Sequence, residues 1–233
     1  MASIKNTGRL AGFLWFLSAL AGSFSLTYLR NKVIVPADAA ATVANIMASQ
    51  FWFRAAVVSN LFSQVLLLFI GLTLFRLFKE VNARLARVLL AAALLTVGTT
   101  VVNTLNQFAA LWLLSGADFL KVFSQEQLNA MTLFFLRLAN SAGQGLIEIF
   151  WVPYYFTFGL LVIQSKYLPK IIGVLLMIVG AGFAINILQK FLAPQFHPLM
   201  FTRLAMTFGG LGGLPTMLWL MIMGARDPRT DVR

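Results

Sequence analysis

The stretch IIGVLLMIVGAGFAINILQ, residues 171–189, contains no charged residue and is bounded by Lys170 and Lys190. A helix needs roughly 20 apolar residues to cross a hydrocarbon layer about 30 Å thick. Because no water inside that layer can bond to backbone groups, such a segment crosses it as a helix. The stretch therefore predicts a transmembrane helix.

Similar apolar stretches recur along the chain, which has 233 residues, 60% hydrophobic and 11% charged, with a mean hydropathy of +0.85. Soluble domains average nearer half apolar and a quarter charged residues. No repeat, low-complexity tract or linker divides the chain, so we expect one domain over residues 1–233. This all-α, polytopic membrane bundle has about six transmembrane helices, predicted near 10–29, 55–75, 88–114, 138–165, 171–189 and 204–225.

The basic residues favour one side of the membrane. The side that holds both termini carries Lys5, Arg9, Arg76, Lys79, Arg84, Arg87, Lys166, Lys170, Arg226, Arg229 and Arg233, and the other carries Arg30, Lys32, Arg54, Lys121, Arg137, Lys190 and Arg203. An excess of Lys and Arg marks cytoplasmic connections, so both termini are expected in the cytoplasm. Residues 10–29 are longer than the apolar core of most signal peptides, which favours a retained span over a cleaved leader.

Two outer connections carry helix signals. After Pro36 and Asp38, the apolar pattern predicts a helix lying at the membrane interface. Ser124 and Gln127 have the Ser-x-x-Gln spacing of a capping box, which predicts that a helix begins there.

Composition excludes several function classes. The net charge of +11 is spread between apolar runs rather than over one soluble face, which favours anionic lipid headgroups at the cytoplasmic face over nucleic acid as partner. With no cysteine and one histidine, we expect no metal and no cofactor. The sequence contains no H-E-x-x-H motif, no G-x-S-x-G motif and no paired carboxylates, so it gives no support for an enzyme.

Polar residues gather at one depth of the predicted bundle. Asn60, Asn103, Glu148 and Asn186 lie 16 to 18 residues from the basic residue that ends their span on the cytoplasmic side, which is roughly 24 to 27 Å along a helix. We expect an outward-facing polar pocket with these candidate lining residues: Glu148, Gln144, Asn140, Asn103, Gln107, Asn60, Gln64, Asn186 and Arg203.

Glu148 is the one charged residue inside a predicted span. An intramembrane charge is costly and usually faces a partner or a cavity. We expect Arg203, at the outer end of the last span, to be that partner. The alternative for the whole layer is structural, since Asn and Gln often only join helices by hydrogen bonds.

Four segments resemble an uncharacterised bacterial membrane family, catalogued as the domain of unknown function numbered 4386, over nearly the whole chain. They are VIVPADAAA (33–41), NQFAA (106–110), LSGADFL (114–120) and SKYLPKIIGVLL (165–176). The resemblance implies a multi-pass protein of the bacterial inner membrane and no assigned reaction. From the polar layer, and not from the resemblance, we expect a non-enzymatic, permease-like bundle that binds a solute or a lipid. The alternative is an accessory or assembly subunit of a larger membrane complex.

Overall fold

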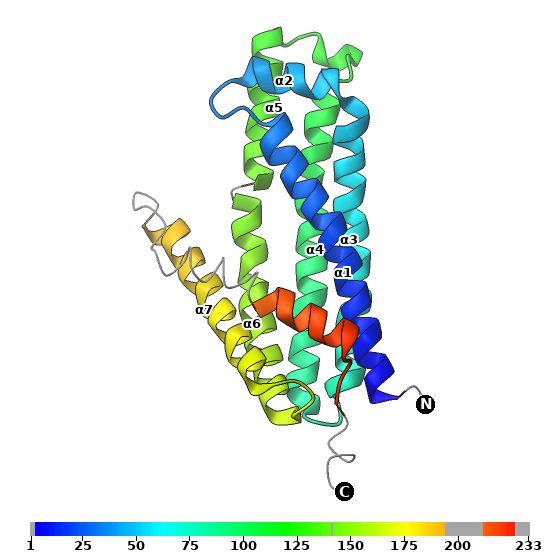
Figure 1. The fold of residues 1–233 in the computed structure, drawn as a ribbon. Coiled ribbons are helices and arrows are strands. Elements are labelled where there is room, and N and C mark those ends of the chain that lie inside the picture. Colours follow the sequence, from blue (N-terminus) through cyan, green and yellow to red (C-terminus); the bar gives the residue numbers. More distant parts are fainter. Residues whose placement is uncertain (1–2, 141, 194–211, 227–233) are drawn as a thin grey trace, which may run out of the picture. The chain divides into compact units, whose positions relative to one another are not determined.

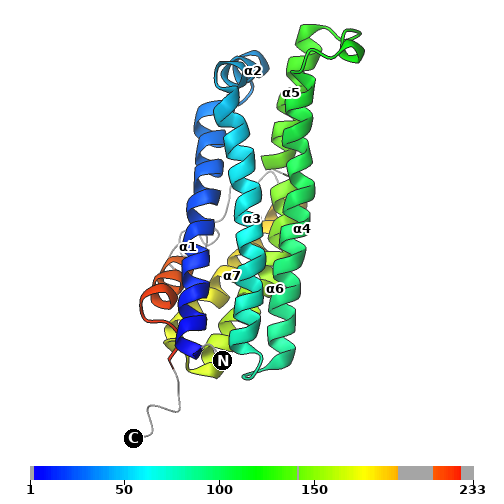
Figure 2. The same cartoon turned by 90° about the vertical axis from the view of Figure 1, so that its right-hand side faces the viewer.

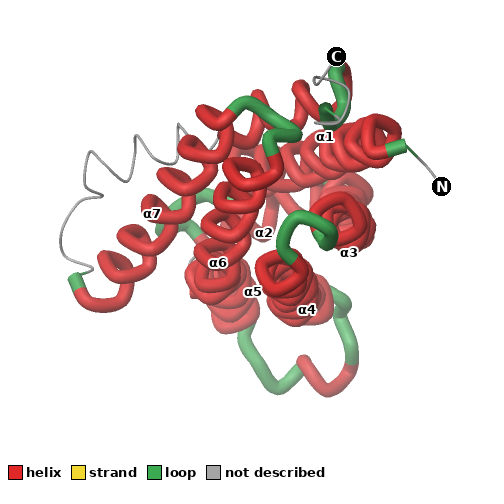
Figure 3. The backbone as a smooth tube through the Cα atoms, turned by 90° about the horizontal axis from the view of Figure 1, so that it is seen from below, coloured by secondary structure: helices red, strands yellow, loops and turns green. Residues whose placement is uncertain are grey.

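The computed structural model describes residues 3–140, 142–193 and 212–226. Only helices, turns and loops occur in those ranges (Figures 1 and 3). The elements in chain order are α1 (Ile4–Tyr28), the π-helical turn η1 (Leu29–Val33), α2 (Ala39–Ala48), α3 (Gln50–Phe78), α4 (Ala83–Leu113), the 3₁₀ turn η2 (Asp118–Leu120), α5 (Gln125–Asn140), α6 (Ala142–Ser165) and α7 (Lys170–Leu192).

Five helical segments in the described ranges are long and apolar enough to cross a membrane. They are Ile4–Val33, Gln50–Phe78, Ala83–Leu113, Gln125–Ser165 and Lys170–Leu192. Each overlaps one of the first five predicted spans, and large apolar side chains such as Phe62 and Phe69 are exposed on them. The protein is therefore an all-helical, multi-pass membrane protein.

The sixth predicted span, 204–225, lies partly outside the described residues. Its described part contains a shorter apolar helix, Gly212–Ile222. The count of six spans and the orientation of the termini stay predictions.

The chain forms two compact units, and α1, α3 and α4 each contribute residues to both. Unit 1 comprises residues 1–17, 65–97 and 145–233. Its core contains Phe78, Leu89, Tyr154, Phe158 and Leu176, all 2% exposed or less.

Glycines bring the helices of unit 1 close together. A Cβ built on Gly159 in α6 would lie 2.5 Å from the carbonyl oxygen of Gly173 in α7, and one on Gly173 would lie 2.7 Å from that of Gly159. Small residues let two membrane helices approach at their backbones, which is how they gain van der Waals contact without a hydrophobic driving force. The Gly159–Gly173 contact therefore sets the packing of α6 on α7.

Unit 2 comprises residues 18–64 and 98–144, with its own core around Val33, Ile46, Phe53, Ala110 and Leu136. Helix α2 packs against α5 and leads into the beginning of α3 (Figure 2).

Local capping signals account for where two helices of unit 2 begin. The Asp38 carboxylate accepts a hydrogen bond from Ala41 N at 2.8 Å and so caps α2. At the start of α5, Ser124 N donates to Gln127 Oε1 (2.8 Å) and Gln127 N donates to Ser124 Oγ (3.2 Å). The predicted capping box is confirmed, and a helix follows Asp38 as expected; its interfacial position stays a prediction.

Candidate functional site

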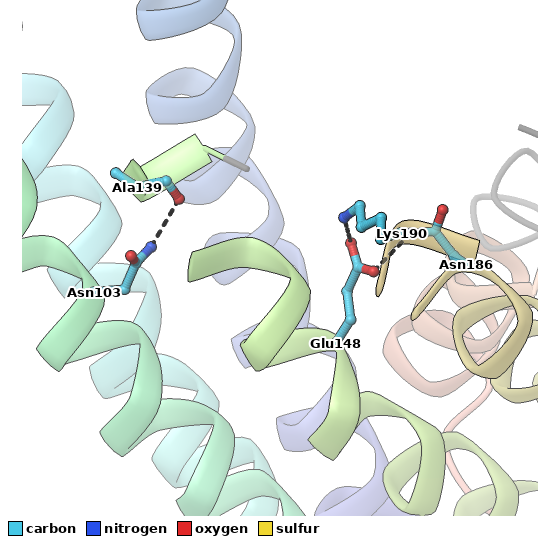
Figure 4. Close-up of polar contacts among 5 residues, drawn as sticks. All are labelled: Asn103, Ala139, Glu148, Asn186 and Lys190. Atoms are coloured by element: carbon cyan, nitrogen blue, oxygen red, sulfur yellow. Dashed lines mark hydrogen bonds and ion pairs between the residues drawn. The ribbon is translucent and has the colours of Figure 1, made fainter. Parts of the chain in front are cut away.

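Glu148 projects from α6 toward α7 and is held there by two side chains (Figure 4). Asn186 Nδ2 donates to Glu148 Oε2 at 2.6 Å, and Lys190 Nζ lies 2.9 Å from Glu148 Oε1. The Glu148 side chain is 12% exposed and that of Lys190 is 36% exposed. These three residues form the Glu148 cluster, which lies within unit 1.

The geometry of α7 explains the cluster. Asn186 and Lys190 are four residues apart, so they share one face of the helix. Side chains on a helix lean toward its N-terminus, which brings the ammonium group of Lys190 back to the level of Asn186. An ion pair with an added hydrogen bond is the usual way to accommodate a carboxylate in an apolar setting.

The expected partner of Glu148, Arg203, lies outside the described residues. Within the described ranges Lys190 takes that role, and the sequence analysis placed Lys190 only among the basic residues of the outer side. The signal that could have identified it is the Asn186-x-x-x-Lys190 spacing, which puts a cation one turn beyond a candidate polar residue.

A second polar cluster lies in unit 2. Asn60 Nδ2 of α3 lies 3.4 Å from Thr104 Oγ1 of α4, and Asn103 Nδ2 donates to the carbonyl oxygen of Ala139 at 3.0 Å (Figure 4). Asn106 Nδ2 donates to Asn103 Oδ1 at 3.2 Å. These bonds join α3 to α4 and α4 to α5, as polar side chains between membrane helices often do.

A glycine makes room for Asn103. A Cβ added at Gly143, at the start of α6, would collide with the side-chain amide of Asn103. The position of this amide therefore depends on the absence of a side chain at residue 143.

Two amides of unit 2 are incompletely bonded. The Oε1 atoms of Gln64 and Gln107 are buried and have no hydrogen-bond partner in the described part of the chain. Gln107 is only 6% exposed. A buried acceptor without a donor costs about 1–3 kcal/mol, so such an atom marks a place where a donor from outside the chain would be stabilising.

The Asn60–Thr104 bond fixes the positions of Gln64 and Gln107 relative to each other along α3 and α4. Gln64 lies one turn beyond Asn60 on α3, and Gln107 lies about one turn beyond Thr104 on the antiparallel α4. At 1.5 Å per residue the two glutamines are separated by roughly 10 Å along the helices, one on each side of the bond. We call Asn60, Gln64, Thr104 and Gln107 the amide cluster.

Of the nine candidates of the predicted pocket, the seven with described side chains divide between the two units. Glu148 and Asn186 meet in unit 1, while Asn60, Gln64, Asn103 and Gln107 lie in unit 2. Asn140 also lies in unit 2, where its Nδ2 donates to the Leu136 carbonyl of its own helix at 2.9 Å. The backbone of Gln144 lies in α6, but its side chain is outside the described part.

Thr104 was missed because a buried threonine usually bonds to its own helix. Thr104 does so, since its Oγ1 donates to the Thr100 carbonyl at 2.8 Å while it receives Asn60. In the described ranges no three His, Asp or Glu side chains gather where a metal ion could be held.

No curated protein and no solved structure matches the chain. One family does match: its model, described as a domain of unknown function (DUF4386), covers residues 10–224. That range takes in every described candidate of both clusters. The fold and the matched range agree with the resemblance carried by the four sequence segments, and the chain belongs to the DUF4386 family.

Proposed function

We propose that this protein is a non-enzymatic, permease-like protein of a bacterial inner membrane, and that it binds a small polar solute at the amide cluster. The observation that carries the proposal is the pair of buried acceptors, Gln64 Oε1 and Gln107 Oε1, which lack donors in the described part of the chain. A solute with N–H or O–H groups would supply them.

The composition of the amide cluster indicates the class of solute. Its members are three amides and one hydroxyl, with no carboxylate and no cation among them. Such a set binds a neutral molecule by hydrogen bonds, because a charged solute would leave its own charge unpaired in an apolar surrounding. We therefore propose a neutral solute with at least two hydrogen-bond donors spaced along α3 and α4.

We assign the Glu148 cluster a different role. Its carboxylate already has a partner on each oxygen, Asn186 on one and Lys190 on the other. We propose that this cluster holds α6 against α7 rather than binding the solute.

Native mass spectrometry of the protein, extracted gently from its own membrane, tests the proposal. The wild type should emerge with a bound small molecule, and Gln107→Leu should lose it, because leucine fills a similar volume without offering an acceptor. The matched control is Gln125→Leu, since Gln125 is exposed at the start of α5 and lies outside the amide cluster, where its side chain donates to Asn129. That variant should retain the molecule.

Two results would overturn the proposal. If the wild type emerges with stoichiometric foreign subunits and no small molecule, the chain is an accessory subunit and its amides only join helices. If Gln107→Leu is more stable to heat than the wild type as extracted, the buried amide oxygen destabilised the native protein because it lacked a donor. No solute was then bonded to it.

A further inference from the structure

Unit 2 contains a groove of about 640 Å³ that is lined by residues from the beginning of α3 and from the end of α4. That volume lies within the range of about 300–1,000 Å³ that is usual for ligand sites. The groove is lined by Gln50, Arg54, Val57, Val58, Phe108, Leu111, Trp112, Leu114 and Ser115. None of these residues belongs to the amide cluster or to the Glu148 cluster.

Each wall of the groove is a single stripe of one helix. On α3 the lining residues from Gln50 to Val58 are spaced mainly three or four residues apart, so they share one face. The other wall has the same spacing from Phe108 in α4 to Ser115, which follows the end of that helix. The stripe on α3 is roughly 12 Å long at 1.5 Å per residue.

The groove is polar at one end and apolar at the other. Because α3 and α4 are antiparallel and Asn60 bonds to Thr104, Gln50 lies near the level of Ser115, and Val57 lies nearer the level of Phe108. Arg54 lies one helical turn after Gln50 on α3, toward the apolar end of the groove. A molecule along the groove would thus meet a cation and two polar side chains first and aliphatic and aromatic side chains below them.

Arg54 has no partner among the residues that the structure describes. Its side chain is exposed, and no ion pair or hydrogen bond joins it to any other residue in the described ranges. Of the three acidic residues of unit 2, Asp38 caps α2 and Asp118 pairs with Lys121 at 2.7 Å. The third, Glu126, forms no ion pair with Arg54 in the described ranges. The groove therefore presents an uncompensated positive charge.

Two exposed tryptophans mark the level of this end in the membrane. Trp112, in the groove, is 74% exposed, and Trp52, beside Arg54 in the sequence, is 52% exposed. Tryptophan concentrates where the hydrocarbon layer meets the headgroups. This preference of tryptophan would put the polar end of the groove at headgroup level and its apolar end at the level of acyl chains.

We infer that this groove binds an anionic phospholipid. The guanidinium group of Arg54 pairs with the phosphate, a geometry in which arginine donates two parallel hydrogen bonds. Gln50 and Ser115 bond to the polar headgroup, and the upper part of an acyl chain lies along Val58 and Phe108. The lipid comes from the leaflet at this end of α3, which the basic-residue pattern assigns to the outer side.

The test is a lipid titration of the delipidated, detergent-solubilised protein by native mass spectrometry. The probes are phosphatidylglycerol and phosphatidylcholine with identical acyl chains. The wild type should bind phosphatidylglycerol roughly fivefold more tightly, since one basic residue at a membrane surface contributes about 1 kcal/mol. Arg54→Gln should abolish that preference. Arg137→Gln, which changes an exposed arginine outside the groove, should keep it.

A second variant separates a lipid site from a simple anion site. Val58 is 63% exposed, so Val58→Trp leaves the core intact and fills the apolar part of the groove. It should weaken binding of both lipids while their ratio is kept. The inference is overturned if Arg54→Gln retains the preference, if Val58→Trp binds both lipids normally, or if millimolar inorganic phosphate displaces phosphatidylglycerol from the wild type.

Discussion

Replacing Lys190 by methionine should destabilise the protein more than replacing its partner, Glu148, by glutamine. In Lys190→Met the carboxylate remains 88% buried in the cluster with only Asn186 as a partner, given that its side chain is 12% exposed. In Glu148→Gln the new amide oxygen still accepts from Asn186, and Lys190, at 36% exposed, can turn toward the polar surroundings.

The magnitude follows from the burial of the two partners. Breaking a fully buried ion pair by removing one member costs about 3–5 kcal/mol. Because Lys190 is more than a third exposed, the pair is screened in part, and we expect about 2–3 kcal/mol for Lys190→Met after that discount. For Glu148→Gln we expect about 1 kcal/mol or less, because only the charge is lost and the shape is kept.

Thermal unfolding in detergent measures both effects. At about 2–4 °C per kcal/mol for a chain of this size, Lys190→Met should lower the Tm by roughly 4–12 °C. The matched control is Lys121→Met, which breaks an exposed pair whose side chains are 74% and 94% exposed and should leave the Tm unchanged. The double variant Glu148→Gln/Lys190→Met should be as stable as Glu148→Gln alone.

Additive losses in the double variant would refute this reasoning, because two residues that act through one contact cannot lose it twice. Equal shifts in Lys190→Met and Lys121→Met would refute it as well, since they would mean that the burial of Glu148 contributes nothing.

Two other predictions concern packing and capping. Gly173→Ala should lower the Tm by several degrees, because the added methyl group would collide with the backbone of α6. The control is Gly98→Ala, which should stabilise α4 by about 0.5–1 kcal/mol, because a Cβ at Gly98 has nothing within 4 Å. Equal Tm shifts in the two variants would contradict the close approach of α6 and α7 at Gly173. Ser124→Ala removes the cap of α5 and should speed hydrogen exchange of its first turn about fivefold, for a cap of about 1 kcal/mol. Hydrogen exchange, followed by mass spectrometry of peptides, should be unchanged in α2, which Asp38 caps. If the exchange rate at Gln127 is also unchanged in Ser124→Ala, Ser124 does not cap α5.

Local signals predicted most of the helices. The spans followed from runs such as 171–189, because an apolar segment in lipid has no alternative to bonding its own backbone. The starts of α2 and α5 followed from Asp38 and Ser124, whose side chains bond to amides only three residues away. Residues 138–165 were predicted as one span, and they lie within the segment Gln125–Ser165, which is long and apolar enough to cross a membrane.

The partners of the polar side chains were not predictable in the same way. The sequence placed Asn60, Asn103, Glu148 and Asn186 at similar depths, yet depth does not say which faces of two helices meet. Within the described ranges Lys190 was found beside Glu148, and Thr104 was found beside Asn60; Arg203, the predicted partner of Glu148, lies outside those ranges.

The amino-acid sequence by itself therefore determined that the chain is a helical, multi-pass membrane protein of this family, because burial in lipid and helix capping act between residues close together in the chain. Only the tertiary structure decided which polar groups are paired, which amide oxygens lack donors and where Arg54 borders a groove. These depend on the rotation and register of one helix against another, and both are set by contacts such as Gly159 with Gly173 between residues far apart in sequence.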